Sequence, residues 1–543
     1  MKRLRAQALI ILLLVVPMPR DCFGQGVYEE QLDRGIRNNG PYSYLLAERA
    51  GREPGGRQLL SEAVKHSPDT PAFYFARAMA GLPNIFESAG FVAKGIKAYG
   101  RDFRRALSLM SLLALSILGA FALAMLMTLV IRLPMALPLI RHDIEEDRRK
   151  LLVVLAVIPV SLLGPVFFMA GGLVLAGFYF RKADKAVVYL ALSLILLSPL
   201  YLSVLDIMLS ASSPKVRAVV SVNEARGNAF AIEVLGDEKG FAPELSYAIA
   251  LKREGRYEEA IEKLRRIPGN DPRAYTDMGN AYVGLGNMAS AKDAYMKSIG
   301  MKESAAALYN LSKVLPDTLE FEESKEMYRK AQSLDGALIQ KLSATESRSP
   351  NRFVADETLT FSELWDYTAR NAAETVRPFT ASPAVASSVS AVCLFLFALL
   401  GRKQRAKRCS RCGAVFCRKC SPGVRRADMC PACYSSLLKP SEQTPKERVA
   451  KLLSLHEGKT KTRRAVRALS FVLPGIAHIY AGKALSGFLY LWAFGFAAVG
   501  LVLNIFFPGY SHGWLNPLFI VMAGMLYLGS ILVVQGRLKR GWL

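Results

Sequence analysis

Long apolar runs alternate with polar stretches along this chain of 543 residues, and the runs set its organisation. A helix needs about 20 mostly apolar residues to cross a bilayer. Runs of this order occupy Leu107–Ile131, Leu151–Phe180, Ala186–Leu209, Ala384–Leu400, Phe488–Phe507 and Leu518–Val534. The pattern predicts an all-α membrane protein, with a membrane region over residues 105–210 and a further transmembrane helix over residues 384–401.

The run over Leu151–Phe180 has two interpretations, because Pro159, Pro165 and a Gly-Gly pair interrupt it. It is either one long kinked helix or a hairpin of two short ones. Basic residues favour the cytoplasmic side of a membrane, and they flank this run on both sides, at Arg132, Arg141, Arg148, Arg149, Lys150, Arg181, Lys182 and Lys185. We therefore prefer the hairpin. It places residues 215–380 outside the cytoplasm and the later cysteine cluster inside, whereas a single helix inverts both.

The chain begins with the basic stretch MKRLR, the apolar run ALIILLLVV and small residues near Gly24. This arrangement is typical of a secretory signal over residues 1–25, with an uncleaved anchor as the alternative. Residues 26–104 are polar and interrupted by prolines, which predicts a small extracytoplasmic domain of degenerate helical hairpins. His66 is expected at the surface of this domain, at a helix end.

The polar region after the third apolar run contains an internal repeat. The stretch ELSYAIALKREGRYEEAIEKLRRIPGNDP is followed by AYTDMGNAYVGLGNMASAKDAYMKSI, with glycine, alanine and tyrosine at matching positions. A third copy is about two residues out of phase. The residues that carry the pattern are Gly255, Tyr257, Ala260 and Pro272, then Gly279, Tyr282, Gly286, Ala291 and Tyr295, then Leu311, Ser324, Tyr328 and Ala331.

This pattern resembles the tetratricopeptide repeat (TPR) family. The resemblance implies a solenoid of paired helices over residues 215–350, in which small residues let the helices approach and larger ones fill between them. It also implies a concave groove that holds a protein partner. Residues 351–383 are predicted to form a helical connector to the next membrane helix.

Six of the eight cysteines lie in one cluster, while Cys22 is in the leader and Cys393 in an apolar run. A disulfide framework is therefore not expected, and thiolate metal binding is the better interpretation. The cluster contains three Cys-x-x-Cys pairs, of which the outer two are separated by seventeen residues, the spacing of common two-knuckle zinc sites. We assign this outer set to one structural zinc: Cys409, Cys412, Cys430 and Cys433. The inner pair, Cys417 and Cys420, forms a second, incomplete site.

The run CSRCGAVFCRKCS…MCPACYSSL resembles the second half of FYVE-type zinc fingers, and the predicted finger covers residues 402–434. The resemblance implies interleaved ligands that pair the same outer cysteines. The first Cys-x-x-Cys of that family is missing here, as is the basic, histidine-containing motif that binds phosphoinositides, so specific phosphoinositide recognition is not expected. The spacings do not match iron–sulfur ligands.

A basic linker over residues 435–465 leads to a predicted membrane hairpin over residues 466–535 and a basic tail over residues 536–543. The hairpin opens with Pro-Gly-x-x-His-x-Tyr-x-Gly-Lys, which resembles the short modules of bacterial TM2-type membrane proteins. We interpret His478 in this motif as a histidine at an interfacial turn beside Lys483.

The formal net charge is +25, and residues 402–467 contain nineteen Lys or Arg against four acidic residues. For a finger held between two membrane segments, anionic lipid headgroups are the nearest counterparts of this charge. Nucleic acid is the less favoured counterpart. The alternative is that these charges only enforce topology.

Together these features predict a bacterial inner-membrane scaffold or adaptor that binds protein partners through its TPR groove and carries a cytoplasmic zinc finger. No catalytic constellation stands out, so the protein is not expected to be an enzyme. One alternative is a transporter or membrane enzyme with a regulatory finger, for which Asp206 is the main acidic residue in the apolar runs. Another is a zinc or redox sensor that uses Cys417 and Cys420.

Overall fold

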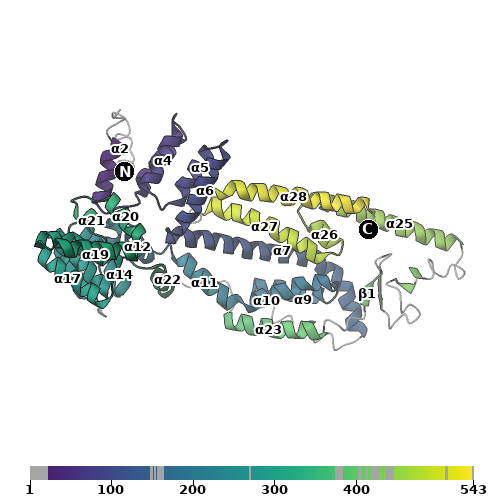
Figure 1. Cartoon of the computed structure of the whole chain (residues 1–543). Coiled ribbons are helices and arrows are strands. Elements are labelled where there is room, and N and C mark those ends of the chain that lie inside the picture. Colours follow the sequence, from purple (N-terminus) through teal and green to yellow (C-terminus); the bar gives the residue numbers. More distant parts are fainter. Residues whose placement is uncertain are drawn as a thin grey trace, which may run out of the picture. The chain divides into compact units, whose positions relative to one another are not determined.

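The computed structural model describes residues 23–146, 151, 154–155, 164–267, 271–372, 383–400, 406–409, 412, 414–417, 429–431, 433–434, 445–507 and 512–540. Several predictions fall wholly or partly outside these residues: the signal segment, the first arm of the middle hairpin, the end of the helical connector, much of the finger including Cys420, the start of the basic linker, and the end of the basic tail. The chain divides into two compact units, each described by itself (Figure 1). We call residues 1–106 with 211–371 the array unit, and residues 107–210 with 372–543 the membrane unit.

The N-terminal part of the array unit consists of short helices that pack in pairs. The helices are α2 (Phe23–Asp33), α3 (Gly40–Ala50), α4 (Gly56–His66), α5 (Pro71–Ala80) and α6 (Ile85–Tyr99), of which α3 packs on α4 and α5 on α6. These helices join the later part of the unit through buried polar contacts. Asn38 Nδ2 donates to the Glu224 carbonyl at 2.8 Å, and Arg226 forms a 2.7 Å salt bridge with Asp102.

The prediction that His66 lies at the surface is wrong. It ends α4, yet only 1% of the residue is exposed, and its Nδ1 lies 2.7 Å from Gln31 Oε1. The rings of Tyr28 and Tyr42 pack against it edge-on. Helix α2 folds back over the end of α4, and that tertiary contact is what buries the ring.

The repeat region forms successive helix pairs with a constant internal spacing. The pairs are α12 (Pro214–Asn223) with α13 (Ala229–Leu235), α14 (Phe241–Arg253) with α15 (Tyr257–Arg265), α16 (Pro272–Gly284) with α17 (Met288–Met301), and α18 (Ala305–Val314) with α19 (Phe321–Leu334). In the last three pairs the second helix starts 16 residues after the first: 241 to 257, 272 to 288 and 305 to 321. The later elements are η2 (Leu315–Thr318), α20 (Gly336–Ala344), α21 (Pro350–Phe353) and α22 (Phe361–Arg370).

Each of these three pairs turns through a residue with positive φ, two positions before its second helix. Gly255 (φ 79°) and Gly286 (φ 74°) fill this position in the first two pairs, and Leu319 (φ 62°) fills it in the third. Glycine adopts this left-handed conformation without steric cost, whereas leucine does not. The third copy therefore keeps the geometry of the repeat while departing from its sequence.

The membrane unit is helical and contains the long apolar segments. It includes α7 (Phe103–Glu146), α9 (Pro165–Gly177), η1 (Ala183–Lys185), α10 (Ala186–Leu196), α11 (Ser198–Ser210), α23 (Pro383–Leu400), α25 (Pro445–Leu469), α26 (Ile476–Tyr480), α27 (Ala484–Phe506) and α28 (Leu515–Lys539). Among the described residues, α7, α27 and α28 are long and apolar enough to cross a membrane, and the pair α10–α11, bent by 59°, makes up to four. The fold class is confirmed as an all-α membrane protein.

Small residues bring the helices of the membrane unit close together. A Cβ at Gly475 would lie 2.2 Å from the Gly487 carbonyl oxygen, so α26 packs on the first turns of α27 with no room for a side chain. Ser390 and Ser387 of α23 donate to the carbonyls of Leu192 (2.5 Å) and Leu196 (2.7 Å) in α10. Small residues at contacts and interhelical serine bonds are typical of helices packed in a membrane.

Candidate functional sites: a cysteine centre and the inner face of the array

A short β-hairpin begins the cysteine-rich region. Strand β1 (Ala406–Arg408) pairs antiparallel with β2 (Val415–Cys417), with Ala406 opposite Cys417 and Arg408 opposite Val415. Cys409 N donates to the Ala414 carbonyl at 2.8 Å, which closes the turn that carries the first Cys-x-x-Cys pair. The hairpin therefore presents Cys409 and Cys412 from one tight turn.

The structure brings the four outer cysteines together. The Sγ atoms of Cys409, Cys412, Cys430 and Cys433 all lie within 4.8 Å of one another, and those of Cys412 and Cys430 are 3.5 Å apart. A tetrahedral ion with Zn–S bonds of about 2.3 Å would separate its sulfurs by about 3.8 Å. The four thiols therefore fit a tetrahedral metal site with small adjustments.

Three of the four cysteines, Cys409, Cys430 and Cys433, are buried, Cys412 is partly exposed, and Phe416 and Leu455 pack around them. Burial raises the pKa of the Cys430 and Cys433 thiols, which favours their neutral form. A bound cation reverses this preference, because thiolates are the ligating form. A closed four-thiolate site leaves no open position for a substrate, so its chemistry is structural.

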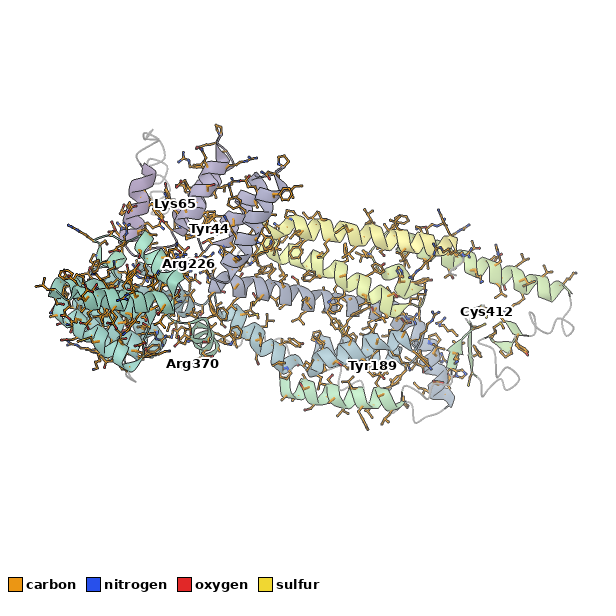
Figure 2. The ribbon with its side chains drawn as sticks, in the orientation of Figure 1. Tyr44, Lys65, Tyr189, Arg226, Arg370 and Cys412 are labelled. Atoms are coloured by element: carbon orange, nitrogen blue, oxygen red, sulfur yellow. The ribbon has the colours of Figure 1, made fainter. Side chains whose placement is uncertain are left out.

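Cys417, the described member of the inner pair, is not part of this centre. Cys417 is buried at the end of β2, outside the group of four, and Cys420 lies outside the described residues. Cys393 is half-buried in α23 and packs against the core of the membrane unit. Figure 2 labels Cys412 in the hairpin region, next to α25.

The hairpin is held to the end of α7 by a residue that the sequence did not single out. Asp143, which is 1% exposed, accepts from Ala406 N through Oδ1 at 3.0 Å and from the Tyr179 hydroxyl through Oδ2 at 3.0 Å. Arg408 donates to the Met135 carbonyl at 2.7 Å. Asp143 stands in a mixed stretch of acidic and basic residues, RHDIEEDRRK, which gives no sequence signal for such a contact.

The inner face of the repeat array is covered by a segment of the same chain, Val354–Thr360, which we call the cis segment. It is extended and lies across α12, α14, α16 and α18, the first helices of successive pairs, which line the concave side of such a solenoid. Val354, Ala355 and Leu359 are all buried. The face predicted to hold a partner therefore already holds a peptide segment.

Asparagine side chains bind the backbone of the cis segment. Asn223 donates to the Leu359 carbonyl at 3.1 Å and accepts from its N–H at 2.6 Å. Asn280 donates to the Ala355 carbonyl at 2.9 Å, and it also accepts from the buried Tyr295 hydroxyl at 2.8 Å. Contacts of this kind depend on an extended backbone and little on side-chain identity.

One side chain of the cis segment makes charged contacts. Asp356 pairs with Lys252 at 2.7 Å and with Arg253 at 2.9 Å, and all three side chains are buried. These two cations hold the pKa of Asp356 at about 2 despite its burial. Glu357 N donates to Asp277 Oδ1 at 3.1 Å, and burial together with the charge of Asp356 raises the pKa of Asp277 well above its usual range. Asp356 is therefore the one acidic position of the segment with two cationic partners.

Asp206, the acidic residue of the transporter alternative, is buried in α11. His478, interpreted as interfacial, is fully buried beside α27, where its ring stacks on Tyr490 at 5.2 Å between centroids.

Comparison with known proteins supports the repeat. A family model of the tetratricopeptide repeat matches residues 272–304, which hold α16, α17 and the start of the next turn. A search of curated proteins finds no match to the chain. The FYVE-type and TM2-type resemblances stay predictions. The chain thus carries a tetratricopeptide repeat within an all-α membrane protein.

Proposed function

We propose that this protein is a membrane-anchored scaffold whose repeat array binds an extended segment of a partner protein in exchange with its own cis segment. The observation that carries the proposal is the way Val354–Thr360 is held. Its backbone is bound by asparagines and its one acidic anchor, Asp356, by Lys252 and Arg253. A partner segment with a small residue followed by aspartate would meet the same donors and acceptors.

The exchange requires a partner that competes with a tethered ligand. A segment on a short linker acts at an effective concentration on the order of millimolar. A free peptide would therefore need a similar concentration, or a partner would need further contacts on the array. Partner binding would therefore increase whenever the cis segment is pulled away from the array. Such a pull can act through α22 and the connector to α23, because they follow the cis segment directly in the chain.

The test uses crosslinking of the full chain in its own membrane, with a synthetic peptide of residues 352–361 as competitor. We expect a crosslinked neighbour that depends on the array and is released by the peptide. The matched control peptide carries Asp356→Lys and should not release it, since it repels Lys252 and Arg253. A neighbour set that is unchanged by loss of the array would overturn the proposal.

The cysteine centre serves this scaffold as a structural zinc site, in our proposal, because its four thiols, three of them buried, fit a tetrahedral thiophilic ion and leave no open position. The array is proposed to lie outside the cytoplasm, and the finger and C-terminus inside. Arg132 and Arg181 flank the middle run on its two sides, and a Cβ at Gly482 would lie 3.9 Å from a guanidinium nitrogen of each. This proximity supports placing both flanks on one side of the membrane.

A further inference from the structure

Four basic side chains meet around one turn of the membrane unit, and we call them the basic cluster. They are Arg132 of α7, Arg181 after α9, Lys483 in the turn between α26 and α27, and Arg537 of α28. The point where Gly482 would carry a Cβ is 3.9 Å from both Arg132 Nη1 and Arg181 Nη2. Lys483 has Arg181 and Arg537 among its nearest charges. The residues are distant in sequence, so only the packing of the helices brings them together.

Among the described residues, Asp184 is the acidic side chain that faces this cluster, and it already has a structural role. It interacts electrostatically with Arg132 and Lys483, and it is 5% exposed. Its Oδ1 accepts from Leu485 N at 2.8 Å, which caps the first turn of α27. Arg408, from β1, adds a further positive charge near Arg132. Positive charge therefore exceeds negative charge around the turn.

Arg132 in particular has no anionic partner within the described part of the chain. Its guanidinium lies over the Phe180 ring at 5.1 Å, and Nη1 is 3.9 Å from Met135 Sδ. Its Nε is buried and makes no hydrogen bond to the described residues. Arginine stays charged in proteins, and a desolvated cation among like charges is costly unless an anion compensates it.

The turn brings its backbone close to these cations. Gly482 has φ +83°, a conformation that favours glycine, and a side chain there would be directed at the two guanidinium groups. His478 precedes the turn, with Lys483 and Arg537 as its charged neighbours, and Lys483 N donates to the His478 carbonyl at 2.9 Å. A side chain larger than alanine at position 482 would therefore meet Arg132 and Arg181.

We propose that the basic cluster binds the phosphate groups of an anionic phospholipid whose headgroup carries more than one negative charge. Arg132 follows the apolar run Leu107–Ile131 within α7, Lys483 precedes the first residue of α27, and Arg537 lies in the last turn of α28. These three helices are long and apolar enough to cross a membrane, and headgroups are found where their apolar segments end. Planar guanidinium groups from two elements suit a phosphate, which accepts several hydrogen bonds at once. The inference rests on the membrane placement in the proposed function, and it is independent of the array and its partner.

The test measures lipid-dependent thermal stabilisation of the purified full chain in detergent, with cardiolipin, phosphatidylcholine and inorganic phosphate as separate probes. We expect cardiolipin to stabilise the protein, phosphatidylcholine to have no effect, and the double variant Arg132→Gln with Arg181→Gln to bind cardiolipin about thirtyfold more weakly. The matched control, Lys461→Gln with Arg464→Gln on the exposed face of α25, removes the same charge and should change binding less than about twofold.

Two further sets of variants test the geometry of the cluster. Gly482→Val places a side chain against Arg132 and Arg181 without changing the charge, and it should also weaken cardiolipin binding. Arg132→Lys with Arg181→Lys keeps the charge and should bind cardiolipin more tightly than the glutamine double variant. Equal loss in the cluster variants and the α25 control would show only a general charge effect and would overturn the site. Stabilisation by inorganic phosphate as strong as that by cardiolipin would replace the lipid with free phosphate. If the full chain binds cardiolipin but shows no crosslinked neighbour that depends on the array, that result would contradict the scaffold proposal and leave the lipid site standing.

Discussion

Asn310 binds both backbone groups of Ala355: its Nδ2 donates to the Ala355 carbonyl at 2.8 Å, and its Oδ1 accepts from the Ala355 N–H at 2.7 Å. An asparagine side chain here takes the place of a neighbouring β-strand. Asn223 forms the same pair of bonds with Leu359 at the other end of the cis segment. The array therefore binds an extended chain by the same logic as strand addition, although it offers only helices.

Replacement by asparagine should destabilise the protein strongly at Asp356 and only slightly at Asp277. Asp356→Asn removes the anion from buried Lys252 and Arg253, and breaking such a pair costs about 3–5 kcal/mol. Asp277→Asn keeps the acceptor used by Glu357 N and removes a carboxyl whose charged form is already disfavoured. It should change the free energy of unfolding by less than about 1 kcal/mol.

Chemical denaturation of the full chain, followed by hydrogen exchange in peptides from α14 and α16, measures both variants. The two changes are isosteric and affect neighbouring side chains, so each is the control for the other. Equal destabilisation would mean that Asp277 is ionised in the native protein. It would also remove the argument that Asp356 is the single anchor of the cis segment.

Leu319→Gly should stabilise the third helix pair. Leu319 adopts φ 62° at the position that Gly255 and Gly286 occupy in the other pairs, and its side chain is 77% exposed. Relief of left-handed strain is worth about 1 kcal/mol, with little packing lost. Slower hydrogen exchange in α18 and α19 would support this, whereas faster exchange would show that the leucine side chain makes a contact that outweighs the strain.

The outer and inner cysteines should differ in metal content. The purified full chain is expected to hold one zinc, and Cys430→Ser should lose it because three thiolates leave the site incomplete. Cys417→Ser should retain it, since Cys417 lies outside the group of four. Elemental analysis of the purified variants, prepared with excess zinc, measures the number of zinc ions per chain in each.

Removal of the metal with a chelator should also expose the four outer thiols to labelling, because the hairpin depends on the ion for its closure. Labelling of a cysteine on α23, Cys393, serves as the control and should not change. If elemental analysis found two zinc ions per chain, one of which is lost in Cys417→Ser, the inner cysteines would form part of a second, complete metal site.

The N-terminal helices should lose stability on acidification. Burial lowers the pKa of His66 below its usual 6.5. As the pH falls through about 6.5, the unfolded chain binds a proton that the native ring does not, so the contribution is present above this pH and is lost toward the lowered native pKa. The protection of α4 peptides against hydrogen exchange, measured relative to the intrinsic exchange rate at each pH, should therefore fall between pH 7 and 5.

His66→Phe keeps an aromatic ring between Tyr28 and Tyr42 and removes the titration. It should be less stable at neutral pH, because Gln31 Oε1 loses its 2.7 Å partner, by about 1 kcal/mol. The protection factor of its α4 peptides should vary less with pH than that of the wild type. The same acid response in both proteins would assign the effect to another group.

The apolar runs by themselves determined the helical membrane fold, because the hydrophobic length of a span is a local property of the sequence. The repeat was equally local: glycine at the turns and alanine and tyrosine in the helices recur at fixed spacing, and α14 to α17 follow them. The assignment of Cys409, Cys412, Cys430 and Cys433 as one set also followed from spacing, since a tight turn fixes each pair and the loop length limits which pairs can meet.

Only the tertiary structure decided what covers the inner face of the array. Val354–Thr360 looks like an ordinary connector in the sequence, and its bonds to Asn223, Asn280 and Asn310 join residues that are 45 to 136 positions apart. The burial of His66, the contact of Asp143 with Ala406, and the basic cluster around Gly482 are of the same kind. Each depends on which helix ends meet, and that is set by packing across the whole unit, which no local pattern of residues encodes.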